Sequence, residues 1–351
     1  MSNASLGQSM KVSTFLTDKE KEEILIFFKR TKFQSHYNNP YWPEFVEPYK
    51  QPLFISLYEN SELVSFAIVY TRMSLCILKF GPVVENPNAI DGIIVQIAKY
   101  LKEKKYGLLT IQFPFFSDLA VNTHLLDRMH REYKIESGEK GWSTIMIALR
   151  SKNIEEIFKA FSKGHKSSIK KAIKDGVEVR LIDNKDDLTK LANIYDDMHH
   201  RKGLIVPLPD SKSAFDKIFK SGLGVFAGVY KGADLLGGTV FVSEGNQFLY
   251  KFGATDVKYF DVSVLHLAIY EMIKYALETK HDVVDLCGYT PDTKEGSYAF
   301  GINRFKKGFG GEVVEYTPLV SVKLNNLRYY FIRCLIVISG IMPEKIKKIF
   351  Y

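Results

Sequence analysis

The sequence predicts an α/β protein in which a mixed sheet, with a helix after its third strand, occurs twice. Runs rich in β-branched and aromatic residues, followed by a glycine corner, a helix and a buried strand, occur at 53–113 and again at 225–286. The tripeptide Lys-Phe-Gly ends the third strand of both copies, at 79–81 and 251–253. A repeated element order of this length indicates duplication. We therefore expect two domains, 14–150 and 151–351.

Composition agrees with a folded protein that meets anionic partners. The 351 residues are 46% hydrophobic and 25% charged, which is typical of a soluble globular chain. The net charge of +8 favours nucleic acid, nucleotides or a membrane surface. The cysteines Cys76, Cys287 and Cys334 are far apart in apolar runs, so we expect reduced thiols in a cytoplasmic protein. No run reaches the roughly 18 apolar residues of a membrane span.

The first half predicts a helix that begins at the capping box Thr17–Glu20. The elements expected after it are a hairpin (53–58 and 63–71), a strand (74–80), a helix (88–104), a strand (108–113), a helix (118–130) and a strand (144–149). The second half predicts a basic helix (154–174), a strand (177–182), a helix (185–201), three strands (224–230, 235–243, 248–252), a helix (262–277), two strands (282–286, 312–316) and a final helix (324–339).

One stretch near the C-terminus concentrates positive charge beside glycines. Arg304, Lys306 and Lys307 lie within the run 301–311, which contains four glycines. Cations beside such a turn suit an anionic ligand or a developing negative charge. It follows a strand–corner–helix–strand crossover, which places ligands where the strand opens into the helix. The alternative is a helix with a solvated basic face and a glycine C-cap.

Seven motifs follow one another along the chain: Phe33-Gln34-Ser35 with Trp42, Phe80-Gly81-Pro82-Val83, Ile111-Gln112-Phe113-Pro114, the basic helix 168–177, Met198 to Leu204, Asp285-Leu286-Cys287-Gly288, and Arg304-Phe305-Lys306-Lys307-Gly308-Phe309-Gly310-Gly311. In this order they resemble the motifs of the Fem family, the aminoacyltransferases that build peptidoglycan interpeptide bridges, and of its wider FemAB, FemX-like and BioF2-like acyltransferase relatives. The last motif is the most specific. The resemblance covers about residues 20–320.

The resemblance implies tandem GNAT-like acyltransferase domains with a substrate groove between them. The implied reaction moves an aminoacyl group from aminoacyl-tRNA to the amine of a peptidoglycan precursor peptide, which is UDP-linked or lipid-linked. No resident cofactor is expected, because the charged tRNA is a co-substrate. The implied location is the cytoplasm, at the inner face of the membrane. The segment Leu324–Met342 is a candidate for peripheral membrane contact, and a core helix is the alternative.

Two other functions stay open. One is an acyl-CoA-dependent N-acyltransferase that acts on an amino sugar or another cell-surface polysaccharide precursor. The glycine-rich corner that holds the pyrophosphate of acetyl-CoA matches neither 81–86 nor 253–261, which disfavours this donor. The other is a non-catalytic module that binds the precursor.

Two residues are the candidates for catalysis. Lys306 matches the lysine of the family signature and would stabilise the oxyanion of the tetrahedral intermediate; the alternative is a surface lysine. Asp285 ends a buried strand and would orient the amine or accept its proton. Its alternative is a hydrogen bond to the following turn.

The remaining candidates would bind substrates. By resemblance, Arg201 and Lys202 contact phosphates or carboxylates; charge at a helix C-terminus is the alternative. The other candidates for substrate binding are Tyr250, Lys251, Arg304, Phe305 and Gln34. Lys163, Lys166, Lys170 and Lys171 lie on one basic helix and suit tRNA phosphates, with a solvated charged face as the alternative. We expect no metal site, because His199 and His200 have no further ligand at metal-binding spacing.

Overall fold

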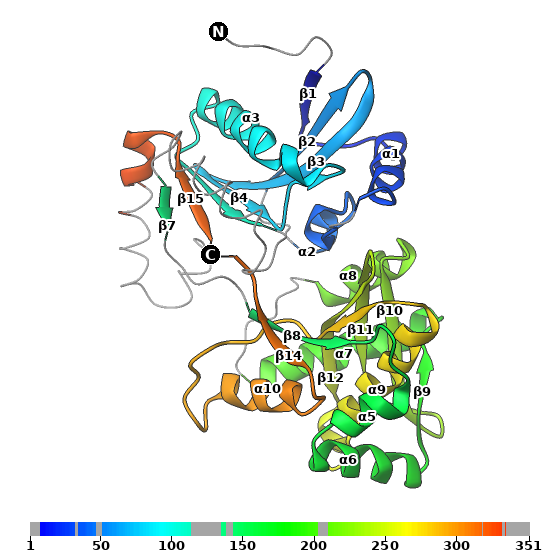
Figure 1. Cartoon of the computed structure of the whole chain (residues 1–351). Coiled ribbons are helices and arrows are strands. Elements are labelled where there is room, and N and C mark those ends of the chain that lie inside the picture. Colours follow the sequence, from blue (N-terminus) through cyan, green and yellow to red (C-terminus); the bar gives the residue numbers. More distant parts are fainter. Residues whose placement is uncertain are drawn as a thin grey trace. The chain divides into compact units, whose positions relative to one another are not determined.

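The computed structural model describes residues 8–31, 34–46, 51–113, 135–137, 143–202, 210–317, 319–331 and 334. These residues fall into two compact units (Figure 1). Unit 1 comprises Met1–Pro40, Tyr49–Gly141 and Tyr316–Tyr351, and unit 2 comprises Tyr41–Pro48 and Trp142–Glu315. Each unit contains one mixed sheet, and each is described by itself.

The sheet of unit 1 has the strand order β1-β2-β3-β4-β6-β15-β7, and the short β5 pairs with β3. Its strands are β1 (Gln8–Ser13), β2 (Gln51–Glu59), β3 (Glu62–Arg72), β4 (Leu75–Lys79), β5 (Val83–Val84), β6 (Leu108–Gln112), β7 (Ile135–Ser137) and β15 (Val320–Lys323). Among the described strands of this sheet, only β4 and β6 pair in parallel. Helix α3 (Ile90–Glu103) connects them and buries Ile93, Ile94 and Ile97 against the sheet. Helix α1 (Asp18–Phe28) begins at the predicted capping box of Thr17 and Glu20.

The sheet of unit 2 has the strand order β14-β8-β13-β12-β11-β10-β9. Its strands are β8 (Ser143–Ala148), β9 (Val177–Leu181), β10 (Gly224–Lys231), β11 (Asp234–Glu244), β12 (Gln247–Thr255), β13 (Val283–Asp285) and β14 (Glu312–Glu315). Its helices are α2 (Pro43–Val46), α5 (Ile154–Ala160), α6 (Lys163–Lys174), α7 (Lys185–Arg201), α8 (Ser211–Lys220), α9 (Val264–Glu278) and α10 (Tyr298–Lys307). Here β12 and β13 form the parallel pair, joined by α9.

Helices cover both faces of the second sheet. Phe226 of β10 contacts Phe215 of α8, with 5.4 Å between the ring centroids. The next strand residue, Ala227, belongs instead to the core cluster that contains Leu267 of α9. Because neighbouring side chains of a strand point to opposite faces, α8 and α9 lie on opposite sides of the sheet.

Two strands depart from the predicted domain boundary between residues 150 and 151. β8 precedes that boundary, yet it pairs with β13 and β14 of unit 2. β15 lies near the C-terminus, yet it pairs with β6 and β7 of unit 1. In Figure 1 the orange β15 therefore lies beside strands coloured from the first half of the chain. Backbone hydrogen bonding between segments far apart in sequence decides both assignments.

Two further predictions about helices need correction. The helix expected over 154–174 is two helices, because Phe161 is extended (ψ 147°) and Ser162 caps α6. Helix α8 lies between 201 and 224, where no helix or strand was predicted. For the run 301–311 the structure confirms the alternative, a helix with a glycine C-cap, because α10 is capped at Gly308. The helix expected over 118–130 lies outside the described residues, and so do 332, 333 and 335–339 of the helix expected over 324–339, of which 326–331 are helical.

No helix among the described ranges is long and apolar enough to cross a membrane.

Candidate active site

The parallel strands β12 and β13 separate at the carboxyl end of β13. Their register covers three pairs, from Gln247–Val283 to Leu249–Asp285. β13 ends there, whereas β12 continues to Thr255. Tyr250 pairs with Phe241 and Phe252 with Val240, so Lys251 is the extra residue of a bulge. Bulges bend a strand and redirect its side chains. Tyr250 and Lys251, which were candidates for substrate binding, lie within β12, beside the place where the parallel pair opens.

Asp285 is a buried carboxyl group at this opening. Its side chain is 2% exposed. Both of the hydrogen bonds that it accepts from described residues end on Oδ1, one from the Thr144 hydroxyl and one from the Cys287 N–H at 2.6 Å. Burial raises the pKa of Asp285, and the two hydrogen bonds and the charges of Lys251 and Lys306 oppose that rise. A carboxyl group that binds its proton more tightly than usual is suited to acid–base work.

Lys306 contacts the turn that follows Asp285. Its Nζ donates to the carbonyl oxygens of Cys287, at 2.5 Å, and Gly288, at 3.0 Å. Both turn residues have left-handed backbone conformations, with φ of 53° and 48°. That conformation is strained at Cys287, a residue other than glycine, and such strain is frequent at functional sites. Burial lowers the pKa of Lys306, opposed by Cys287 and Asp285. The two catalytic candidates therefore meet at one turn, and Lys306 also stabilises that turn.

Two neighbouring groups stay neutral at physiological pH. Burial, reinforced by Asp285, raises the pKa of Cys287 to about 12, which makes its thiol a poor nucleophile. Burial also raises the pKa of Tyr250, with Tyr298 and Cys287 adding to the rise. A Cβ at Gly253 would lie 2.1 Å from the Tyr250 hydroxyl oxygen. The glycine of the second Lys-Phe-Gly tripeptide therefore makes room for this tyrosine.

Most of the signature motif around α10 is explained by packing. Phe309 is fully buried, and a Cβ at Gly308 would lie 2.1 Å from Cε1 of His165. Gly310 has φ of 74° and lies against the Ala160 carbonyl. The Phe305 ring packs 5.6 Å from the His165 ring. These contacts give Phe305 a role in the core of unit 2, and its contact with substrate stays a prediction.

His165 connects helix α6 to helix α10, which carries Lys306, and the sequence did not point to it. Its Nε2 lies 2.8 Å from the Phe305 carbonyl oxygen, and its Nδ1 lies 3.0 Å from the Ser162 hydroxyl. A carbonyl only accepts, so Nε2 carries the proton. Burial lowers the pKa of His165, which favours the neutral ring. Its only sequence signal is its place after a serine N-cap.

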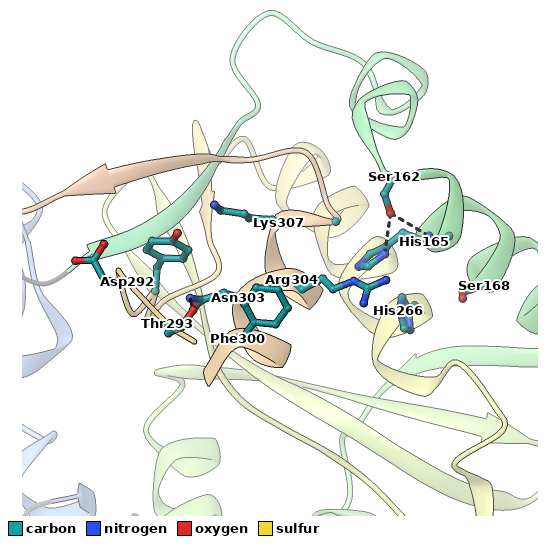
Figure 2. Close-up of a pocket in the computed structure, with 13 residues that line it drawn as sticks. Ser162, His165, Ser168, His266, Asp292, Thr293, Phe300, Asn303, Arg304 and Lys307 are labelled. Atoms are coloured by element: carbon teal, nitrogen blue, oxygen red, sulfur yellow. Dashed lines mark hydrogen bonds between the residues drawn. The ribbon is translucent and has the colours of Figure 1, made fainter. Parts of the chain in front are cut away.

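A pocket of about 830 Å³ lies between α6, α9 and α10 (Figure 2). Its lining residues are Ser162, Gly164, His165, Ser168, His266, Tyr289, Asp292, Thr293, Phe300, Asn303, Arg304, Lys307 and Gly308. Arg304, predicted to bind substrate, therefore lines this pocket, whereas the amine of Lys306 is at the Cys287–Gly288 turn.

The other predicted cations of unit 2 lie over aromatic rings. The Arg201 guanidinium lies 4.6 Å from the centre of the Phe260 ring, and Lys202 Nζ lies 5.3 Å from that of Tyr298. Burial, followed by the charge of Arg201, lowers the pKa of Lys202. Lys251 Nζ lies 5.7 Å from the centre of the Trp42 ring. Rings in these positions hold the long side chains in place.

Gln34 has a local role in unit 1. Its Nε2 donates to the carbonyl oxygen of Phe28, the last residue of α1, at 2.5 Å. The side chain therefore adds to the hydrogen bonds that this carbonyl accepts from the N–H and the hydroxyl of Thr31 at the end of the helix. Contact between Gln34 and a substrate stays a prediction.

The lysines proposed for tRNA line the outer face of α6. Lys163, Lys170 and Lys171 are exposed, and Lys166 is half-buried and donates to the Lys159 carbonyl at 3.1 Å. The face they expose is suited to phosphates, and tRNA contact stays a prediction. His199 is buried, with Nδ1 2.9 Å from the Tyr195 carbonyl. Within the described ranges, no cluster of three His, Cys, Asp or Glu side chains could hold a metal ion.

Comparisons with known proteins bear on the family and the fold of the chain. The FemAB family model matches residues 124–206 and 228–336, more than half of the chain. A crystal structure of FemX has 16% identity and a TM-score of 0.75 over 92% of this chain and 99% of its own. The C-terminal domain of a putative lysylphosphatidylglycerol synthetase from Agrobacterium fabrum has 11% identity and a TM-score of 0.61, covering 89% and 93%. A tandem GNAT protein from the clavulanic acid biosynthesis pathway has 9% identity and a TM-score of 0.52, covering 91% and 99%.

A search of curated proteins finds no match. The structural likenesses confirm the predicted fold class, an α/β protein with tandem GNAT-like domains. The family match confirms the resemblance drawn from the motifs. The chain belongs to the FemAB family of acyltransferases.

Proposed function

We propose that this acyltransferase is an aminoacyltransferase of the FemX type, which moves an aminoacyl group from aminoacyl-tRNA to the amine of a peptidoglycan precursor peptide. The observation that carries the proposal is that Asp285 and Lys306 both contact one strained turn, Cys287–Gly288, where β12 and β13 separate. The family and the likeness to FemX over nearly the whole chain support it.

The two side chains divide the chemistry of acyl transfer. The acceptor amine attacks the ester carbonyl of the donor, so that a C–N bond forms and the ester C–O bond breaks. Asp285 takes the proton that the amine loses and returns it to the departing ribose hydroxyl. Raising the pKa of this carboxyl brings it closer to the pH at which such a transfer is efficient.

Lys306 stabilises the tetrahedral intermediate. An ammonium group has three donors, and the carbonyls of Cys287 and Gly288 take two of them among the described residues. The third N–H is directed to the oxyanion. Because the two carbonyls fix the ammonium group before the reaction, little reorganisation is needed when negative charge develops.

The substrates are anionic, which agrees with the net charge of +8. In this proposal Lys163, Lys166, Lys170 and Lys171 contact tRNA phosphates, and Arg201 and Lys202 contact the precursor. The precursor is linked to UDP or to a lipid, and the enzyme works in the cytoplasm. The charged tRNA is the acyl donor, so the reaction needs no resident cofactor.

Ligand binding tests the substrates first. A ligand that binds only the folded state raises the melting temperature as RT ln(1 + [L]/Kd). We expect a UDP-muramyl-pentapeptide to raise it and acetyl-CoA to leave it unchanged. A shift with acetyl-CoA alone would replace the proposal with the acyl-CoA-dependent enzyme. Transfer to phosphatidylglycerol in place of the peptide would assign the acceptor named by the lysylphosphatidylglycerol synthetase relative.

A transfer assay with charged tRNA then tests the residues. Lys306→Met should lower the rate about 100-fold or more, because a preorganised oxyanion donor contributes that much. Lys212→Met changes the same charge at an exposed position of α8 and should keep the full rate. A Lys306→Met protein that keeps its rate would contradict the catalytic role, and a kept rate with a lowered melting temperature would show that Lys306 only stabilises the turn.

A further inference from the structure

One end of the sheet of unit 1 is defined by a row of four paired residues. Arg72, the last residue of β3, pairs with Leu75, the first residue of β4. Leu75 pairs with Leu108, the first residue of β6, and Leu108 pairs with Lys323, the last residue of β15. The parallel strands β4 and β6 therefore both begin at this end. Their carboxyl ends, where the parallel pair opens, lie at the opposite end of the sheet.

A short helix over 326–331 follows β15 at this end of the sheet, drawn in orange in Figure 1. Just before it, the Leu324 N–H donates to the Gly107 carbonyl at 3.0 Å, which attaches the segment to the loop before β6. Tyr329 is 4% exposed and forms a small core cluster with Leu108. One side of the helix is therefore part of the core, as one of the two alternatives for this segment requires.

The other side of this helix exposes apolar side chains. Leu327, Tyr330 and Phe331 have the spacing i, i+3, i+4, which places them on one side of a helix. Leu327 is 82% exposed, and Tyr330 and Phe331 are each 60% exposed. Met73, in the turn that joins β3 to β4 at the same end of the sheet, is 69% exposed. Single exposed apolar residues are common, whereas a group of them at one place indicates an interaction surface.

Cations accompany these apolar side chains. The segments that form this end, 72–75, 102–108 and 323–331, contain one carboxylate, Glu103. Their six cations are Arg72, Lys102, Lys104, Lys105, Lys323 and Arg328. None of the six forms an ion pair with another residue that the structure describes. Lys323 Nζ lies 4.2 Å from the centre of the Tyr330 ring, so a positive charge is directly beside an exposed aromatic side chain.

We propose that this end of unit 1 docks on a membrane surface that contains anionic phospholipids. Leu327, Tyr330, Phe331 and Met73 lie in the interfacial layer, and the cations contact the lipid phosphates. Apolar side chains flanked by lysine and arginine are the combination that binds such a surface. The inference does not depend on the donor or the acceptor of the transfer reaction.

Two other occupants fit this surface less well. A second copy of the chain in a symmetric contact would bring the same cations face to face, which is unfavourable. Single-stranded nucleic acid binds by stacking its bases on aromatic rings beside cations. Leu327 and Met73, the two most exposed apolar side chains of the surface, offer no ring for stacking. An anionic lipid surface uses both the aliphatic side chains and the charges.

Co-sedimentation of the full chain with lipid vesicles tests the surface without any transfer reaction. Vesicles of equal parts phosphatidylglycerol and phosphatidylcholine should bind the protein, and binding should weaken as the salt concentration rises. Vesicles of phosphatidylcholine alone should bind it at least about tenfold more weakly, because each cation near an anionic surface adds to the affinity.

Two variants separate the apolar and the charged contributions. Leu327→Ser should weaken binding about tenfold or more through lost apolar burial. Lys104→Gln should weaken it about fivefold at low salt. Met73→Asn keeps the left-handed backbone of its turn (φ 54°), which asparagine tolerates. It should also weaken binding, and it provides a second apolar variant if Leu327→Ser does not fold.

Two matched controls should bind like the parent. Ile26→Ser changes a residue of α1 that is 60% exposed. Arg30, just after α1, donates to the Leu63 carbonyl near the start of β3, at the other end of that strand from Met73. Lys212→Gln removes an exposed lysine of α8 in unit 2.

Three results would overturn the proposal. The first is a parent chain that does not sediment with phosphatidylglycerol vesicles at millimolar lipid. The second is equal binding by the parent, Leu327→Ser, Met73→Asn and Lys104→Gln. The third is a dimer of the parent in analytical ultracentrifugation without lipid that becomes a monomer in Leu327→Ser, which would assign the surface to a second copy of the chain. Because sedimentation needs no substrate, its failure is distinguishable from a failure of the proposed function.

Discussion

The two units end their parallel strand pairs in chemically different ways. In unit 1 the last β4–β6 pair is Lys79–Gln112, and the Gln112 amide, 2% exposed, donates to the Thr317 carbonyl at 3.1 Å. Asn38, fully buried, donates to the carbonyls of Lys79 and Phe80, both at 2.9 Å. In unit 2 the last β12–β13 pair is Leu249–Asp285, and an acid and a lysine meet the turn that follows.

This difference distinguishes residues that stabilise the fold from residues that are suited to catalysis. Neutral amides satisfy buried backbone groups without a charge to desolvate. A buried carboxyl and a buried amine cost stability unless they are well paired. Either arrangement is compatible with this sheet. Unit 2 has the carboxyl and the amine, which is the arrangement that lowers stability more. A cost of that kind, at the open end of a strand pair, is expected where a reaction takes place.

The largest expected effect comes from giving unit 1 the acid of unit 2. Gln112→Glu places a carboxylate next to the Thr317 carbonyl, in a site built for an amide donor. We expect a loss of about 3–5 kcal/mol in the free energy of unfolding at pH 7, measured by urea denaturation. Gln96→Glu, at a half-buried position of helix α3, is the control and should cost under about 1 kcal/mol. An equal cost at both positions would contradict the comparison.

The next effect tests how α10 is held in unit 2. Gly308→Ala places a methyl group against the His165 ring and should cost about 2–3 kcal/mol of unfolding free energy. Gly301→Ala, in the same helix with nothing within 4 Å, should stabilise by up to about 1 kcal/mol. In a His165→Ala background the cost at Gly308 should disappear. Additive costs in that double-mutant cycle would show that the ring is not the obstacle.

Asp285→Asn makes unit 2 resemble unit 1. Both described hydrogen bonds of Asp285 end on Oδ1, which asparagine keeps, so the turn should survive. Transfer should fall about 100-fold with the proton acceptor gone. Because folding raises the pKa of this acid, the native state binds more protons, and this group lowers stability as pH rises above its usual pKa of 3.8. Thermal melts across that range should show the decrease in the parent and not in the variant.

The smallest effect comes from the histidine pair beside the pocket. His266 has a folded pKa of about 4, below its usual 6.5, so the unfolded state binds more protons between these values. Stability contributed by the neutral ring is complete above pH 6.5 and is lost as pH falls towards 4. His266→Phe should remove roughly 2 kcal/mol of this pH dependence, measured by urea denaturation at pH 7 and pH 4.5. If the unfolding free energy changes equally between pH 7 and pH 4.5 in the parent and in His266→Phe, burial does not lower the pKa of His266.

Local sequence determined the element types, their order and the repeat. Hydrophobic period and β-branched content marked the hairpin of β2 and β3 and helix α3, because those signals act within a few residues. The capping box at Thr17 marked the start of α1 for the same reason. The motif around Lys306 identified the family. Its glycines and Phe309 are recognisable in the sequence because close packing contacts require those residue types at those positions.

Only the tertiary structure shows which segments far apart in the sequence pair or come into contact. The placement of β8 and β15 depends on backbone pairing with strands far away in sequence. The meeting of Asp285 with Lys306 depends on a turn and a helix 19 residues apart, and the role of His165 depends on a contact over 140 residues. A residue's neighbours in the chain set its conformation, whereas its burial, its pKa and its partners are set by segments that only the folded chain brings together.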